Sequence, residues 1–88
     1  MDNKQAKIYS VELGGAGAEL DLHGLRVFEA EEKIESFLFA CQKQKTDVAK
    51  IIYGVGTGAL ERGVVDYLKN HPLVDGLVLH SGYCIVLF

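Results

Sequence analysis

Two polar residues in the segment ELDLHG (19–24), Asp21 and His23, stand two positions apart and could carry out proton-transfer chemistry. Alternate side chains of a strand share a face, so this pair would point to one side while Leu20 and Leu22 point to the other. Histidine titrates near neutral pH, and a nearby carboxylate can orient it, hold a metal or act as a base. An exposed pair of this kind is more often plain solvated surface, so its surroundings must decide between the two interpretations.

A glycine-rich stretch, YGVGTGAL (53–60), places glycine at positions 54, 56 and 58. A strand, a glycine-rich turn and a helix in that order direct the free N–H groups and the positive dipole end of the helix at an anion. Gly54, Gly56 and Gly58 lack the side chains that would keep a phosphate at a distance, and Thr57 could cap the helix or donate its hydroxyl. The alternative is a tight turn that binds nothing. We favour phosphate binding, because one or two glycines would suffice for a turn.

The same stretch also matches a dinucleotide fingerprint at Gly54, Gly56 and Ala59, with Asp75 at about the right distance for a ribose contact. The match is weak, because the chain is too short for the two-halved dinucleotide fold and Asp75 falls at the start of an expected strand. The P-loop pattern is absent, since no Gly-Lys-Ser/Thr follows the glycines. A nucleotide or small-phosphate binder is therefore only a third hypothesis.

Hydrophobic periodicity predicts seven elements in the order β-β-α-β-α-β-β. The expected strands are 9–13, 19–23, 48–53, 74–79 and 83–88, and the expected helices are 26–45 and 58–70. This order predicts an α/β two-layer sandwich, with two helices mainly on one face of a mixed four- to five-stranded sheet. We expect one globular domain overall, with residues 1–18 as an N-terminal strand and glycine-rich connection and residues 19–88 as the main unit.

The strands at Leu20 and Ile51 are joined through a helix, so they should be parallel with a right-handed crossover. Their carboxyl ends then lie at one edge of the sheet, which is where ligands bind in open α/β sheets. Asp21 and His23 end one strand and the glycine loop leaves the other. The topology thus predicts that these two features meet at one place.

Composition favours a globular domain and excludes several other classes. The chain has 88 residues, 49% hydrophobic residues and a single proline, with no stretch long enough for a membrane span. The N-terminus lacks the apolar segment of a secretory signal, and Cys41 and Cys84 fall in apolar patterns without a metal-binding cluster, so we expect a cytoplasmic protein with reduced cysteines. The net charge of −3 argues against a protein that coats nucleic acid non-specifically.

Three segments together resemble the small MutS-related (Smr) domain family: ELDLHGL (19–25), IIYGVGTGAL (51–60) and VVDYLKNHPLV (64–74). That family is marked by an LDLHG motif and an HGxGxG loop, and the resemblance runs from about Glu19 to the C-terminus. It implies a nucleic-acid-binding domain, which in several relatives is a nicking endonuclease. Asp21 and His23 match the positions implicated in cleavage, and the glycines at 54, 56 and 58 match the loop that contacts nucleic acid.

The resemblance implies nucleic acid as the partner but does not decide between DNA and RNA. The metal ion is also unknown, and Mg²⁺ and Mn²⁺ are the candidates. Arg26, Lys50 and Arg62 are the basic residues expected near the site. Tyr53 stands where the family usually has histidine, which removes one proton-transfer group. A tyrosine could instead donate its hydroxyl to a phosphate or stack on an unpaired base, or pack into the core. The alternative to a nuclease is therefore a binding module that has lost the chemistry.

Overall fold

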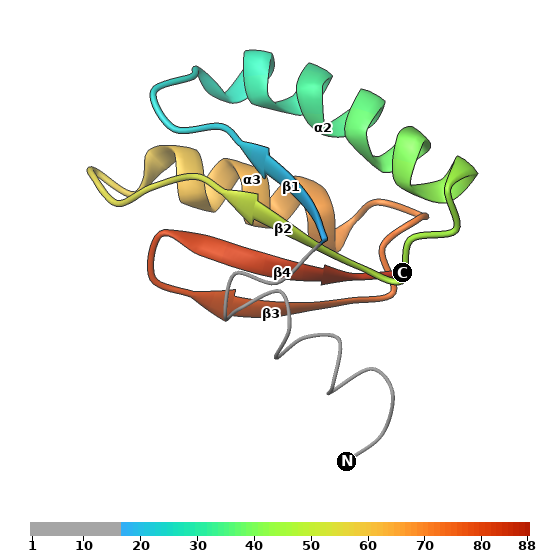
Figure 1. The fold of residues 1–88 in the computed structure, drawn as a ribbon. Helices are drawn as coiled ribbons and strands as arrows, with labels where there is room; N and C mark the ends of the chain where they lie inside the picture. Colours follow the sequence, from blue (N-terminus) through green and yellow to red (C-terminus); the bar gives the residue numbers. More distant parts are fainter. Residues whose placement is uncertain (1–16) are drawn as a thin grey trace.

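Four strands and two helices make up residues 17–88, the part of the chain that the computed structural model describes. Their order is β1 (Ala18–Asp21), α2 (Val27–Lys43), β2 (Val48–Ile52), α3 (Ala59–Lys69), β3 (Gly76–His80) and β4 (Tyr83–Leu87) (Figure 1). The strands form one mixed sheet in the order β1-β2-β4-β3. The expected α/β sandwich is therefore confirmed, with four strands in this part of the chain. The strand expected at 9–13 and the connection at 14–16 lie outside the described residues.

β1 and β2 are parallel, as the helical crossover between them predicts, and Asp21 pairs with Ile52 at their shared carboxyl edge. β4 lies between β2 and β3 and runs antiparallel to both. This arrangement brings the turn between β3 and β4 to the same edge, because Ile52 pairs with Tyr83 and Tyr83 pairs with His80. Three connections that are far apart in the sequence therefore meet there.

Both helices pack on one face of the sheet and bury residues at spacings of three and four. α2 contributes Ala30, Ile34, Leu38 and Cys41, and α3 contributes Val64 and Leu68. They cover Ile51, Cys84 and Val86 of the central strands. The helices approach each other closely, since a Cβ added at Gly63 would lie 2.8 Å from Cγ1 of Val27.

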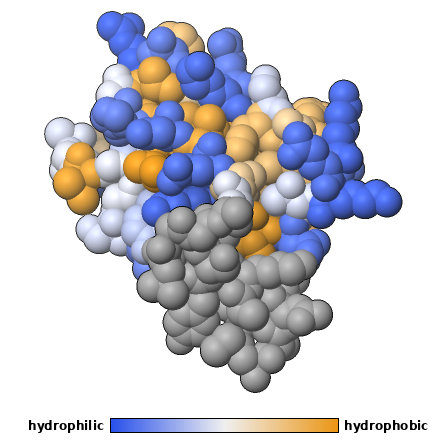
Figure 2. All heavy atoms as spheres, viewed as in Figure 1, coloured by the Kyte–Doolittle hydropathy of each residue, from blue (hydrophilic) through white to orange (hydrophobic). Residues whose placement is uncertain are grey.

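The opposite face of the sheet carries a smaller apolar cluster around Val48 and Ile85. Alternation along β2 and β4 separates this cluster from the residues under the helices. In the view of Figure 2, hydrophobic surface is interspersed with hydrophilic side chains. Among the described residues, the exposed large hydrophobic side chains are Phe28, Phe39, Val55 and Leu79.

The ends of the elements differ from expectation by at most two residues. α2 ends at Lys43, because Gln44 leaves the helix and Lys45 takes a left-handed conformation with φ of 56°. β3 begins at Gly76 rather than at residue 74, because the N–H of Val74 donates to the carbonyl of His71 in a turn after α3. No helix within residues 17–88 is long and apolar enough to cross a membrane.

Candidate nucleic-acid site

Asp21 and His23 form a hydrogen-bonded pair at the carboxyl end of β1. Nδ1 of His23 lies 2.7 Å from Oδ1 of Asp21, and the same oxygen accepts the backbone N–H of His23 at 3.1 Å. Both side chains are open to solvent, with exposed fractions of 72% for His23 and 50% for Asp21. Buried Leu22 between them anchors the segment, and its N–H donates to the carbonyl of Ile52.

The electrostatics of the pair fix the tautomer of the imidazole. Hydrogen bonding from the His23 side chain, and then from its backbone N–H, lowers the pKa of Asp21 below its ordinary value of 3.8. Asp21 is therefore ionised at neutral pH and can only accept hydrogen bonds. Nδ1 of His23 must carry the shared hydrogen, which leaves Nε2 with a lone pair in the neutral ring. Nε2 is the atom that can accept a proton from a substrate or water.

The glycine loop adjoins this pair, as the topology predicts. A Cβ added at Gly54 would lie 3.4 Å from the Cβ of His23, and Gly54 has a left-handed φ of 80°. The two sequence motifs thus meet at one edge of the sheet. A small depression of about 200 Å³ lies beside the loop and is lined by Gly24, Leu25, residues 53–58, Leu60 and Glu61. It is smaller than the clefts of roughly 300 Å³ or more that enclose small-molecule ligands.

The start of α3 provides the donors that an anion requires. Gly58 is the N-cap in a left-handed conformation with φ of 87°, which favours glycine there. The hydroxyl of Thr57 accepts the N–H of Ala59 at 3.3 Å, so it occupies one donor of the first turn. The other N–H groups of a first turn have no partner inside the helix and face outward with the positive end of the dipole.

The three basic residues occupy different places relative to the loop. Nη1 of Arg62 lies 3.3 Å from the position that a Cβ on Gly58 would take, so its guanidinium covers the start of α3. Arg26 is exposed at the N-cap of α2, two residues after Gly24. Lys50 lies further back on β2, with its Nζ 4.6 Å from the centre of the Tyr83 ring and 4.0 Å from Oε1 of Glu19. Arg62 is the cation best placed for a phosphate on the loop.

Tyr53 packs in the core, which is the alternative to the expected role in base stacking or phosphate contact. Its side chain belongs to the main core cluster and the residue is 3% exposed. The hydroxyl donates to the carbonyl of Tyr83 at 2.8 Å and approaches that of His80 at 3.3 Å. Burial raises the pKa of the phenol above its ordinary value. Its ring cannot receive a base, and its hydroxyl is engaged with the β3–β4 turn.

Gly82 in the β3–β4 turn supports the glycine loop, which the sequence did not indicate. Its carbonyl accepts the N–H groups of Tyr53 at 3.0 Å and Gly54 at 2.8 Å. A Cβ at Gly82 would lie 3.9 Å from the Gly54 backbone, so the turn packs directly on the loop. The sequence marked only a hairpin turn here, since no local pattern reveals that β4 lies beside β2.

Metal ligands are sparse in this part of the molecule. Within residues 17–88 no group of three or more His, Cys, Asp or Glu side chains could hold a metal ion. A divalent ion at Asp21 would therefore need most of its ligands from substrate phosphate and water.

The two cysteines offer no alternative chemistry. Cys41 and Cys84 are buried, and burial raises the pKa of both thiols, that of Cys84 to about 12.

Comparison with known proteins places the two motifs and the fold together in one family. The Smr domain family model matches residues 20–82. The chain belongs to the Smr domain family. The structure is also similar to the crystal structure of the Smr domain of Thermus thermophilus MutS2, with a TM-score of 0.76 and 25% sequence identity. The superposition covers 80% of this chain and 95% of that one.

The curated relatives of this Smr domain are longer proteins. It is 42% identical over 76 residues to "Endonuclease MutS2" of Listeria monocytogenes, which is 84% of this chain but 10% of that protein. It is also 40% identical over 55 residues to "Ribosome rescue factor SmrB" of Shewanella oneidensis, which is 62% of this chain and 31% of that protein. The chain thus spans about a tenth and about a third of the lengths of these two relatives.

Proposed function

We propose that this domain binds nucleic acid at the edge formed by Asp21, His23 and the glycine loop, and that it cleaves a phosphodiester bond there. The observation that supports this most is the contact between the two motifs, with Gly54 packed beside His23. A phosphate on the loop would lie next to the free Nε2 of the imidazole. Membership of a family that includes proteins named as an endonuclease and a ribosome rescue factor supports DNA or RNA as the substrate class.

In the proposed reaction Nε2 of His23 accepts the proton of the attacking hydroxyl, from water or from a sugar. The hydroxyl oxygen forms a bond to phosphorus while the bond to the leaving oxygen breaks, and the leaving oxygen takes a proton from solvent. Asp21 positions the imidazole and stabilises its positive charge. The first-turn N–H groups of α3 and the Arg62 guanidinium stabilise the charge on the phosphate oxygens. A divalent ion, if bound, would add Lewis-acid stabilisation of the same oxygens.

The core position of Tyr53 bears on the speed of this reaction. Where relatives of the family carry histidine, this chain has a phenol that is buried and bonded to backbone carbonyls. No second imidazole therefore stands at that position to protonate the leaving oxygen. We expect slow cleavage, and the binding module without cleavage is the second candidate on this observation.

Two reduced, buried cysteines support a cytoplasmic site of action.

The site is tested by chemical-shift mapping of the full chain with single-stranded, duplex and branched oligonucleotides. We expect the largest changes at residues 21–25 and 54–60, and changes confined to other surfaces would contradict the proposal. Nicking of supercoiled plasmid with a divalent metal present, compared between the parent and Asp21→Ala, separates the two candidates. Cleavage that Asp21→Ala abolishes supports the nuclease, whereas binding without cleavage supports the module.

A further inference from the structure

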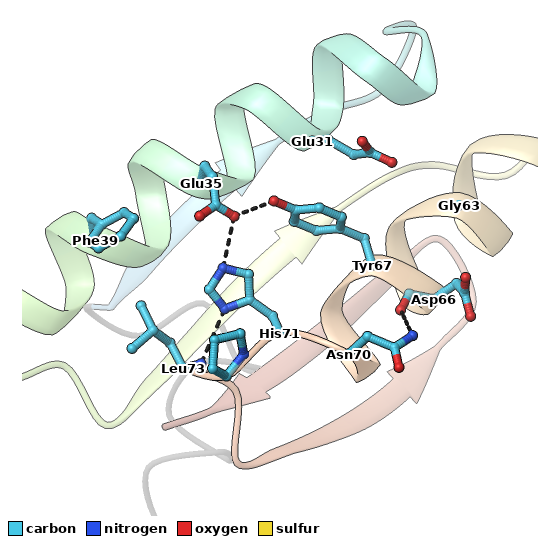
Figure 3. A pocket seen from close by; sticks show the side chains of 10 residues that line it. Glu31, Glu35, Phe39, Gly63, Asp66, Tyr67, Asn70, His71 and Leu73 are labelled. Carbon is cyan, nitrogen blue, oxygen red and sulfur yellow. Dashed lines mark hydrogen bonds and ion pairs between the residues drawn. The ribbon is translucent and has the colours of Figure 1, made fainter.

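A groove between α2 and α3 has no part in the site described above. It has a volume of about 640 Å³ and shares no lining residue with the depression beside the glycine loop (Figure 3). One wall consists of Glu31, Glu35 and Phe39, which are spaced by four and so follow one line along α2. The other wall consists of α3 and the segment after it.

A hydrogen-bond cluster fixes the carboxylate in the middle of this groove. Oε2 of Glu35 accepts a hydrogen bond from the hydroxyl of Tyr67 and lies 2.8 Å from Nε2 of His71 (Figure 3). Nδ1 of His71 accepts the N–H of Leu73, so Nε2 must carry the hydrogen that goes to Glu35. Both ring nitrogens of His71 are hydrogen-bonded, and its side chain is only 7% exposed. This histidine therefore has a structural role and not a catalytic one.

The groove combines negative charge with apolar surface. Hydrogen bonding from Tyr67, and then from His71, lowers the pKa of Glu35, which keeps its charge at neutral pH with 41% of the side chain exposed. Glu31 and Asp66 add two carboxylates, and no lysine or arginine is among the lining residues. Phe39 is 51% exposed, and Pro72 and Leu73 complete the apolar part.

We infer that this groove binds an arginine side chain of a protein partner, followed by an apolar residue of the same segment. A guanidinium is planar, pairs with carboxylates through several N–H groups, and stacks on aromatic faces more readily than an ammonium does. Glu31, Glu35 and Phe39 offer carboxylates and a ring in one line. The same carboxylates repel phosphate, so the groove does not extend the nucleic-acid site.

The test uses acetyl-Arg-Leu-amide as the probe and acetyl-Gln-Leu-amide as its uncharged control, both titrated into the full chain and followed by amide chemical shifts. Saturating changes at Gly63, Asn70 and Leu73 are expected with the arginine peptide. They should weaken strongly with the glutamine peptide and at about 0.5 M salt, where exposed charges are screened. Glu31→Gln should weaken binding about threefold, the size of one exposed ion pair.

Glu32→Gln is the matched control, because it removes the same charge from the neighbouring position on α2, which lines a separate depression with Lys33 and Ser36. It should leave the affinity of the arginine peptide nearly unchanged. Equal affinity for the two peptides, equal loss in Glu31→Gln and Glu32→Gln, or shifts confined to the glycine loop would each overturn the inference. None of these outcomes depends on whether the domain cleaves nucleic acid.

Discussion

Oδ1 of Asp21 accepts two hydrogen bonds from one residue, the ring Nδ1 of His23 at 2.7 Å and its backbone N–H at 3.1 Å. The carboxylate therefore fixes both the backbone turn after β1 and the orientation of the imidazole. Since the ring shares its Nδ1 hydrogen with Asp21, Nε2 is directed away from the carboxylate. This relationship gives the exposed imidazole of His23 a fixed orientation.

The pKa of Asp21 should depend on this partner. In the folded protein His23 lowers that pKa below 3.8, so the pair contributes stability above pH 3.8, and the contribution is lost as the pH falls through the lower folded value. His23→Ala should raise the Asp21 pKa back toward 3.8. Carbon-detected NMR titration of the carboxyl group measures this directly. An unchanged pKa in His23→Ala would show that the pair does not persist in solution.

Gly54→Ala should destabilise the fold because of backbone conformation and not because of crowding. Its φ of 80° is costly for a residue with a Cβ, by about 1 to 2 kcal/mol. Gly76→Ala is the matched control, because its added Cβ would meet Leu87 at 3.4 Å, the distance at which a Cβ on Gly54 meets His23. Urea denaturation should show a loss for Gly54→Ala and little change for Gly76→Ala. Equal effects would mean that φ at Gly54 is unimportant.

Tyr53→Phe should lower stability without lowering affinity for single strands. The variant removes the hydroxyl that donates to the carbonyl of Tyr83 and leaves that partly buried acceptor without this donor, at a cost of about 1 to 2 kcal/mol. The ring stays in the core, where no base can reach it. Thermal melting and fluorescence anisotropy with a labelled single strand measure the two effects. A variant of parental stability that binds more weakly would place the ring at the nucleic-acid surface after all.

The hydrogen bond between Tyr67 of α3 and Glu35 of α2 should be lost in strong alkali. Hydrogen bonding to Glu35 raises the pKa of Tyr67 to about 12, so the neutral phenol contributes stability below pH 10. That contribution is lost as the pH rises through the folded value, between about pH 10 and 12. Denaturation midpoints measured across this range should fall more steeply for the parent than for Tyr67→Phe. Parallel curves for the two proteins would show that the pKa of Tyr67 is not raised by Glu35.

Much of the candidate site follows from local sequence and one topological rule. Residues 20 and 51 lie in strands joined through a helix, which predicts parallel strands and places Asp21, His23 and the glycine loop at one edge. The structure shows β1 and β2 parallel, with a Cβ on Gly54 next to His23. The core position of Tyr53 also had a signal, since it continues the alternation of Ala49 and Ile51, which are buried.

The contacts that the sequence did not indicate join residues far apart in the chain. Gly82 supports the loop only because β4 inserts between β2 and β3, and pairing order is not written in any local pattern. Glu35 meets Tyr67 and His71 across more than 30 residues, where the sequence shows only the end of a helix before Pro72. Such contacts depend on how α2 and α3 cross, which side-chain packing determines.

The central claim is that Nε2 of His23 accepts the proton of the hydroxyl that attacks a phosphate held by the neighbouring loop. The most direct measurement is single-turnover cleavage of an end-labelled oligonucleotide by the parent and His23→Ala, with binding measured in the same samples. His23 is exposed, so the variant should fold and bind like the parent but cleave about a hundredfold or more slowly, the contribution of a general base. Equal cleavage by the two proteins, or no cleavage by the parent with any divalent metal, would contradict the claim.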